Sequence, residues 1–202
     1  MKKRRKSRKI GSFFYLCLLL CFSILLLFQY LRDSGFLTES KKNQAVPYPT
    51  ELHPIVAERS KQLIQQTAKK GIVVVITDGY RSAEDQDQLY AKGRTAPGEI
   101  VTYAKGGESF HNFGLAIDFA LKTSAGKIIW DRQYDGNKNG KADWTEVVET
   151  AKGIGFEWGG DWPQFKDYPH LEMNFGLTIA DLQSGERPPG SPMTADSDDG
   201  EK

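Results

Sequence analysis

The stretch SFHNFGLAID, residues 109–118, and the shorter stretch DYPH, residues 167–170, decide how this chain is interpreted. They hold two of the three histidines in the chain, and each of these histidines lies three or seven residues from an aspartate. Imidazole and carboxylate groups are ligands that zinc prefers, and three of them leave one coordination position open for water. The two stretches therefore predict a zinc site of the hydrolytic type.

The first of these ligand groups lies on a predicted strand, residues 115–121, which is almost entirely apolar. Asp118 shares a face of this strand with two alanines, and these small neighbours leave space around its carboxylate. His111 precedes Asp118 by an odd number of residues, so Gly114 has to break the extended path to bring the two side chains together. The spacing leaves one alternative open, in which His111 caps a turn and Asp118 pairs with His170.

The second histidine begins another predicted strand, residues 170–175. Polar and apolar residues alternate there, so His170 and Glu172 point the same way while the apolar residues pack inward. Pro169 excludes a regular helix through this segment, so Asp167 approaches His170 through a bend.

Further motifs in the chain resemble those of the D-alanyl-D-alanine carboxypeptidase and VanY-like zinc peptidases. Besides the two histidine motifs, the resemblance rests on GYRS at 79–82, LYAKGR at 89–94 and KGG at 105–107. It covers roughly residues 52–176, with the separate motifs in the right order. Within this group the chain is most similar to the L-alanyl-D-glutamate endopeptidases of cell walls and phage endolysins.

The resemblance implies a ligand set and a base. Zinc would be bound by His111, Asp118 and His170, and the general base would be Asp167, where many relatives carry glutamate. Because aspartate is one methylene shorter, it has to lie nearer the water than glutamate would. Glu172 is the competing candidate for the base, since it shares a face with His170.

The same resemblance implies two substrate contacts. Arg81 would face the metal and stabilise an oxyanion or a substrate carboxylate, a task that suits a fixed guanidinium group. Ser109 is the second residue that we expect to contact the substrate. The alternative for Arg81 is an ordinary surface ion pair with Glu84 or Asp85.

The function that follows is hydrolysis of peptidoglycan stem peptides, at the L-Ala-D-Glu bond. One alternative keeps the chemistry but changes the bond, giving a D-Ala-D-Ala carboxypeptidase. The other is a zinc-dependent wall-binding module without catalysis, and the presence of Asp167 and Arg81 argues against it.

The N-terminal part of the chain predicts a membrane anchor. Residues 1–9 carry seven positive charges and form a basic cytoplasmic head. Residues 10–31 carry none, and as a helix they would extend about 33 Å at about 1.5 Å per residue, which is enough to cross a bilayer core. The catalytic domain would then lie outside the cell. The alternative is a signal peptide cleaved between Tyr30 and Gly35, which would give a secreted protein.

Charge and cysteine content limit the partners of the remaining chain. The formal net charge is +1, so residues 10–202 carry −6, the difference between +1 and the +7 of the basic head. Such a body is not suited to nucleic acid. Both cysteines lie in the apolar span, so the exported part has no internal disulfide. We expect a monomer whose partners are the stem peptide and the membrane.

The secondary-structure pattern predicts one α+β domain, residues 51–180, with a mostly antiparallel sheet and flanking helices, the architecture that the resemblance also implies (Hedgehog and DD-peptidase-like). Residues 32–50 form a stalk, and residues 181–202 form a disordered acidic tail. The predicted helices are 51–71, 82–92 and 144–153, and the predicted strands are 72–76, 115–121, 127–130 and 170–175.

The stretch DGNKNGKADWTE, residues 135–146, fits the pattern of a twelve-residue calcium loop. Oxygen-bearing side chains fall at positions 1, 3, 5, 9 and 12, glycine falls at position 6, and a backbone carbonyl would serve at position 7. The predicted ligands are Asp135, Asn137, Asn139, Lys141 through its carbonyl, Asp143 and Glu146. No helix is predicted before the loop. The alternative is a hairpin rich in asparagine and glycine.

Overall fold

The structure is a computed structural model of the whole chain, and it describes residues 46–191 together with Tyr15, 22–27 and 29–30. The chain divides into two units, Met1–Val46 and Pro47–Lys202. In the first unit, residues 22–27 and 29–30 are helical. The predicted basic head, most of the predicted anchor and the stalk up to residue 45 lie outside the described residues. Among the residues that are described, no helix is both long and apolar enough to cross a membrane.

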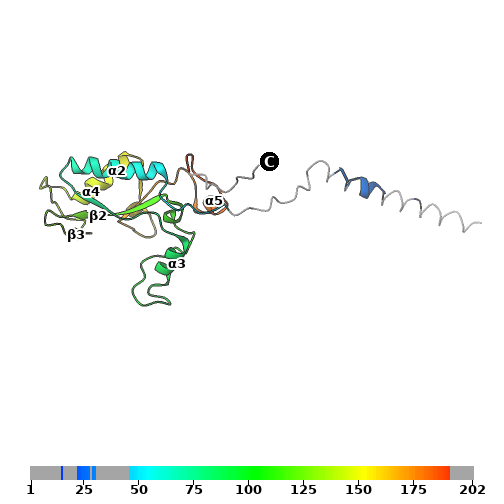
Figure 1. Cartoon of the computed structure of the whole chain (residues 1–202), viewed down its shortest axis with the longest axis horizontal. Helices are drawn as coiled ribbons and strands as arrows, with labels where there is room; N and C mark the ends of the chain where they lie inside the picture. The colour runs from blue at the N-terminus through cyan, green and yellow to red at the C-terminus, as the bar shows by residue number, and fades with distance from the viewer. Residues whose placement is uncertain (1–14, 16–21, 28, 31–45, 192–202) are drawn as a thin grey trace, which may run out of the picture. The chain divides into compact units, whose positions relative to one another are not determined.

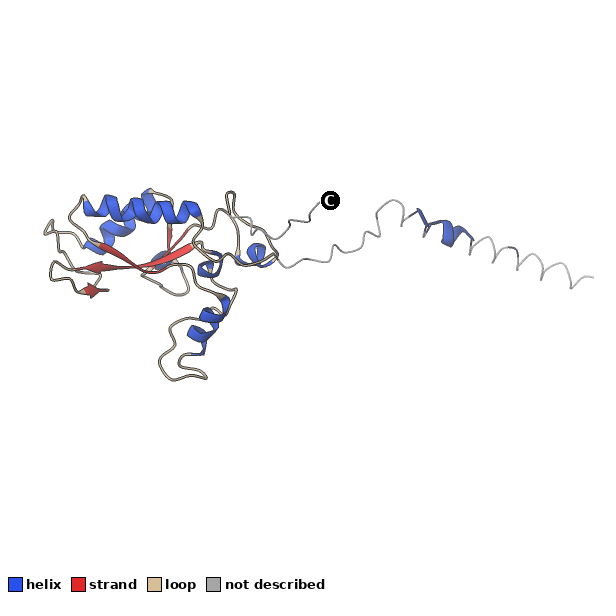
Figure 2. Cartoon of the chain, in the orientation of Figure 1, coloured by secondary structure: helices blue, strands red, loops and turns tan. Residues whose placement is uncertain are grey.

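An antiparallel sheet of five strands forms the centre of the second unit (Figures 1 and 2). The strand order is β1-β2-β5-β4, and β3 pairs with β2 as a hairpin. This arrangement confirms the predicted α+β domain with an antiparallel sheet. The strands are β1 (Val74–Asp78), β2 (Ala116–Lys122), β3 (Ile128–Ile129), β4 (Glu157–Trp158) and β5 (His170–Glu172).

Two helices, α2 (Pro54–Ala68) and α4 (Asp143–Gly153), lie side by side on one face of this sheet (Figure 1). Their apolar faces and the inner face of β2 form the core, in which Leu63, Phe119 and Val147 are fully buried. The ring of Trp144 at the start of α4 packs on Phe119, with 4.4 Å between ring centroids.

The third histidine of the chain, His53, lies at the start of α2. Pro54 occupies the first helical position, and the buried His53 caps the helix by accepting a hydrogen bond from the Ile55 N–H to its Nδ1 atom. His53 thus has a structural role.

A third helix, α3 (Ala83–Ala91), and the loop after it extend away from the sheet (Figure 2). Ser82 caps α3, its hydroxyl accepting a hydrogen bond from the Asp85 N–H. Two short 3-10 helices, η1 (Phe110–Phe113) and η2 (Gly159–Asp161), and a last helix, α5 (Ile179–Gln183), complete the fold.

Among the predicted strands, β1 and β5 differ most from their predicted bounds. Strand β1 begins two residues later than expected and continues to Asp78, two residues beyond the predicted end. Strand β5 ends at Glu172, because the chain turns at Phe175, which has a φ of 55°, and the Asn174 side chain accepts from the Gly176 N–H.

The prediction that disorder begins at residue 181 is wrong for residues 181–191. The side chain of Leu182 is buried, and the Gln183 amide donates to the Gly107 carbonyl over 2.9 Å. Thr178 and Asp181 form a capping box that fixes the start of α5. The buried Leu182, the Gln183 hydrogen bond and a local cap therefore keep the segment on the domain despite its polar composition. Residues 192–202 lie outside the described residues.

Candidate active site

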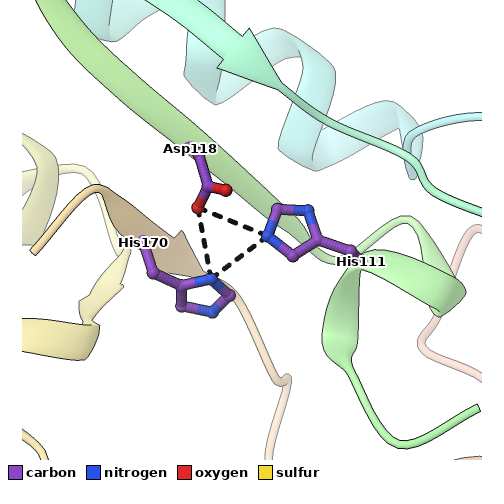
Figure 3. A group of neighbouring side chains, drawn as sticks. All are labelled: His111, Asp118 and His170. Carbon is purple, nitrogen blue, oxygen red and sulfur yellow. Dashed lines mark hydrogen bonds and ion pairs between the residues drawn. The ribbon is translucent and has the colours of Figure 1, made fainter. Parts of the chain in front are cut away.

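The three predicted zinc ligands converge on one point (Figure 3). The Nε2 atom of His111 lies 3.4 Å from Oδ1 of Asp118, and the Nδ1 atom of His170 lies 3.5 Å from the same oxygen. The two ring nitrogens are 3.2 Å apart. All three ligand atoms lie within 4.8 Å of one another, which is the spacing that a single metal ion requires.

Three separate elements bring these side chains together. Asp118 in β2 is paired in register with His170 in β5, so both point from the same face of the sheet. His111 comes from η1, which ends at Gly114 with a φ of 66°. This left-handed turn redirects the chain into β2, as the sequence predicted. A Cβ atom on Gly114 would lie 2.3 Å from the Glu51 carbonyl oxygen, so only glycine fits there.

The outward-facing ring nitrogens of both histidines are held by hydrogen bonds. The Nδ1 atom of His111 lies 2.6 Å from the Gly79 carbonyl oxygen, which can only accept. The Nε2 atom of His170 lies 2.8 Å from Oε2 of Glu172, which is buried. Because both partners accept hydrogen bonds, the outward nitrogens, Nδ1 of His111 and Nε2 of His170, carry the ring protons. In these tautomers the inward nitrogens have lone pairs that can bind a metal ion.

This donor set fits a zinc ion. Two lone pairs of nitrogen and one carboxylate oxygen face each other, and Oδ1 of Asp118 is buried without a hydrogen-bond partner in the described part of the chain. Such a cluster is repulsive unless a cation lies among the three atoms. Nitrogen and oxygen ligands in this number match a zinc site with an open position. The metal-free alternative, with His111 capping a turn, does not match the arrangement.

In the metal-free protein the surroundings of His170 favour the protonated imidazole. Burial opposes a charge on His170, but hydrogen bonds to Asp118 and Glu172 outweigh burial and raise its pKa to about 9. Burial likewise opposes a charge on Asp118, and its contacts with the two imidazoles overcome this and hold its pKa below the ordinary value.

Arg81 lies beside the metal ligands, and its partners differ from those named in the alternative. Its guanidinium group donates to the carboxylate of Asp78 and, over 2.7 Å, to the side-chain oxygen of Gln86. Its Nη2 atom is 3.8 Å from Oδ2 of Asp118, the oxygen that faces away from the histidines. These contacts differ from the alternative surface pair with Glu84 or Asp85, and they fix the guanidinium next to the ligand cluster.

Ser109 is the N-cap of η1, and its hydroxyl accepts from the His111 N–H over 3.3 Å. It therefore helps to position a ligand, and its contact with the substrate stays a prediction. The sequence reasoning missed Asn112, which is fully buried. The Asn112 amide donates to the carbonyls of Arg81 and Ser82 and accepts from the Gly107 N–H. Its position inside the histidine motif was the available signal.

Asp167, the predicted base, lies beside the ligand cluster. Its N–H donates to the carbonyl of Gly159, and a Cβ atom at Gly159 would lie 2.6 Å from the Asp167 carbonyl oxygen, so the chain approaches here because glycine leaves room. Burial, and then the charge of Asp118, raise the pKa of Asp167, while the histidines and Arg81 act in the opposite direction.

The ligand cluster opens into a cavity of about 610 Å³, which is also lined by Arg81, Ser109, Asp167 and Glu172. Its remaining walls include aromatic side chains that the sequence reasoning did not assign to the site. Trp162 lies 5.0 Å from the His170 ring, and Phe165 meets Tyr103 edge-on at 5.9 Å. The cavity size suits a short peptide segment.

The predicted calcium loop contributes no residue to this cavity, and its last four residues form the start of α4. In the described ranges, His111, Asp118 and His170 are the only group of three or more His, Cys, Asp or Glu side chains with metal-binding spacing. The carboxylates of the loop are therefore less closely gathered than the zinc ligands.

Comparison with known proteins places the chain in a family. Residues 102–173, which include all three metal ligands and Asp167, match the D-alanyl-D-alanine carboxypeptidase family. Over 162 residues the chain is 57% identical to the peptidoglycan L-alanyl-D-glutamate endopeptidase CwlK of Bacillus subtilis strain 168, covering 80% of this chain and 95% of that protein. The chain belongs to this peptidase family. It is thus an enzyme of the metallopeptidase class, with a His/Asp/His site.

Two further relatives of this peptidase are more distant. The L-alanyl-D-glutamate peptidase of Listeria phage A118 is 32% identical over 116 residues, which are 57% of this chain and 36% of the phage protein. Among solved structures, the L,D-carboxypeptidase DacB from Streptococcus pneumonia is 19% identical with a TM-score of 0.46, over 68% of this chain and 73% of that one.

Proposed function

We propose that this peptidase is a zinc enzyme that hydrolyses the L-Ala-D-Glu bond in the stem peptides of peptidoglycan. The observation that carries the proposal is the 57% identity, over 95% of its length, with a protein named as a peptidoglycan L-alanyl-D-glutamate endopeptidase. The His/Asp/His cluster, which lines a cavity of a size that fits a short peptide, supports the same activity.

His111, Asp118 and His170 would hold the zinc ion, which acts as a Lewis acid and lowers the pKa of a water molecule toward neutrality. Asp167 is the proposed general base. It lines the same cavity, and its raised pKa brings the carboxylate closer to the range in which it can take a proton and then return it to the leaving amine.

Glu172 is less suited to the role of the base. Its carboxylate is buried and already accepts a hydrogen bond from His170 over 2.8 Å. A group in that position fixes the orientation of a metal ligand and leaves the inward ring nitrogen free to bind. We assign Glu172 as a positioning residue.

Arg81 would stabilise the negative charge that develops on the substrate, or bind a substrate carboxylate. Its guanidinium is held by Asp78 and Gln86 and needs no reordering when substrate binds. The D-Glu residue of the proposed substrate has a carboxylate of its own, which Arg81 and Ser109 on the cavity wall would bind.

Purified muropeptides provide the test. Digestion by the zinc-loaded enzyme should yield new amino-terminal D-Glu and new carboxyl-terminal L-Ala ends by mass spectrometry, and His111→Ala should yield neither. The family description supports a second candidate, a D-Ala-D-Ala carboxypeptidase. Release of free D-Ala without the new internal ends would establish that candidate, and intact muropeptides that remain bound would establish a non-catalytic wall-binding module.

We also propose that residues 10–31 anchor the enzyme in the cell membrane with its catalytic domain outside. The proposal is supported by the uncharged 22-residue segment that follows seven positive charges. The full chain should sediment with membranes and be released by detergent, whereas a chain lacking residues 1–31 should be soluble. A mature protein that begins between Tyr30 and Gly35 would instead establish a cleaved signal peptide.

A further inference from the structure

The loop formed by residues 135–146 has no part in the proposed catalysis, and its polar side chains turn inward. The side-chain amides of Asn137 and Asn139 both donate to Oε2 of Glu146, over 3.0 and 2.7 Å. The two carboxylate oxygens of Asp135 accept from the N–H groups of Asn139 and Gly140. Positions 1, 3, 5 and 12 of the loop therefore gather around one space.

A separate observation concerns Asp143, at position 9. The residue is only 2% exposed, and its Oδ2 atom accepts from the Gly136 N–H across the loop. Its Oδ1 atom is buried and has no hydrogen-bond partner within residues 46–191. A buried carboxylate oxygen without a donor is costly, and a cation in the loop would remove that cost.

Like charge surrounds this unpaired oxygen. Asp135 and Glu146 both contribute to raising the pKa of Asp143, after the larger effect of burial and against hydrogen bonds from two loop amides. Asp135 and Glu146 thus add negative charge near Asp143, and the asparagine amides and the Gly136 N–H donate to the carboxylates of Glu146 and Asp143. Without an ion, the side-chain amides of Asn137 and Asn139 donate to the Glu146 carboxylate that a cation would otherwise bind.

We propose that this loop binds one Ca²⁺ ion, separate from the zinc site. The ligands are the side chains of Asp135, Asn137, Asn139, Asp143 and Glu146 and the carbonyl oxygen of Lys141. All are oxygen atoms, in the number that Ca²⁺ takes, whereas zinc favours nitrogen and sulfur. Gly140, with a φ of 84°, supplies the sharp turn at position 6.

Binding would stabilise the helix that follows the loop. Asp143 begins α4 and Glu146 lies in its first turn, so the ion ties the start of the helix to the loop. The next residue, Trp144, packs on Phe119 of β2. The expected consequence is greater stability of the folded domain, because an ion that binds only the folded state shifts unfolding to higher temperature.

The test uses the full chain, solubilised in detergent and loaded with one equivalent of zinc. Titration with CaCl₂ in a calorimeter should reveal one site, with a Kd on the order of 10⁻⁴ to 10⁻³ M because only three carboxylates bind the ion. At about ten times that Kd, Ca²⁺ should raise the Tm by roughly 3–6 °C. MgCl₂ at the same concentration should have a much smaller effect.

Variants distinguish Ca²⁺ binding by the loop from a general effect of ionic strength on stability. Asp135→Asn and Glu146→Gln should each weaken Ca²⁺ binding at least about tenfold. Glu149→Gln, an exposed position on the same helix, is the matched control and should bind as the parent does. His111→Ala should also retain the calcium site. Because Asp135 is only half-buried, Asp135→Asn should fold, and it tests the calcium site even if Glu146→Gln fails to fold.

Three results would overturn the proposal. The first is that about 10 mM CaCl₂, ten times the weakest expected Kd, gives neither binding heat nor a Tm shift. The second is that Asp135→Asn and Glu149→Gln bind Ca²⁺ with equal affinity. The third is that His111→Ala loses Ca²⁺ binding, which would mean that the ion occupies the zinc ligands instead.

Discussion

The two carboxylates closest to His170 in sequence have different surroundings and therefore different roles. Glu172 is 4% exposed and bonded to the outward nitrogen of His170. Asp167 is only partly buried, lines the cavity, and has a raised pKa because of burial and of the charge on Asp118. The first arrangement orients a ligand, and the second holds a group that can exchange protons with a substrate.

At this scale we predict that Asp167→Ala keeps its zinc but loses activity by about 10²–10⁴-fold in kcat, because a positioned acid–base group contributes about that much. Zinc content is measured by metal analysis and kcat by release of muropeptide products. Asp161→Ala, which removes an exposed ion pair with Lys152, should remain near parental activity. Full activity of the Asp167 variant would transfer the role of the base to another group.

The opposite pattern is expected for Glu172→Gln. Without the carboxylate, His170 is oriented less firmly, and zinc affinity should fall about 10–100-fold. Activity should recover when excess zinc is added, which a missing base would not allow. Activity that stays low at saturating zinc would contradict a positioning role.

At the scale of elements, the segment between β4 and β5 shapes the site. Gly159 begins η2, and its missing side chain lets the backbone of Asp167 approach, while the Trp158 indole donates to the Tyr168 carbonyl over 2.8 Å. The Phe119 N–H donates to the Pro169 carbonyl and ties the segment to β2. The position of Asp167 thus depends on how the segment before β5 packs against η2 and β2.

Gly159→Ala tests this dependence. A Cβ atom would lie 2.6 Å from the Asp167 carbonyl oxygen and 3.1 Å from Cβ of His170, so we expect a loss of about 1–3 kcal/mol in stability together with reduced activity. Gly153→Ala is the control, because a Cβ atom there meets nothing within 4 Å and alanine favours the helix by about 0.5–1 kcal/mol. Urea unfolding and kcat measure both variants, and equal behaviour would refute the packing argument.

At the scale of the whole molecule, zinc binding is coupled to pH. The raised pKa of metal-free His170 stabilises the fold fully below its ordinary value of 6.5, and this contribution is lost as pH rises through about 9. Zinc has to displace that proton, so its apparent affinity should rise about tenfold per pH unit toward about pH 9 and then level off. Competition with a chromophoric chelator measures this slope, and a flat profile between these pH values would contradict it.

The same coupling predicts how stability responds to chelation. Because three elements meet only at the metal ligands, removal of zinc should lower the Tm, and the difference between zinc-loaded and metal-free protein should grow as pH rises from 6.5 to about 9. Calorimetric scans of both forms across this range provide the check.

The local chemistry of this protein could be derived from the sequence. Residue types and short spacings predicted a metal site of the zinc type, the turn at Gly114, the shared direction of His170 and Glu172, and the antiparallel α+β architecture. The turn and the shared direction depend on neighbouring residues or on alternation within a strand, and such effects are visible in a sequence. The ligand set His111, Asp118 and His170 came from the resemblance to the zinc peptidases, because spacing alone left a metal-free alternative open.

Only the tertiary structure decided which segments meet. Three contacts could not be derived from any periodic pattern: the hydrogen bond from Asn112 to the Arg81 carbonyl, the hydrogen bond from Arg81 to Gln86, and the packing of Trp162 on His170. The burial of Leu182 likewise follows no periodic pattern. The distinction between Asp167 and Glu172 also arises there, because a carboxylate acquires its pKa and its partners from the groups that folding places around it. A sequence specifies which groups are present, whereas packing determines their distances.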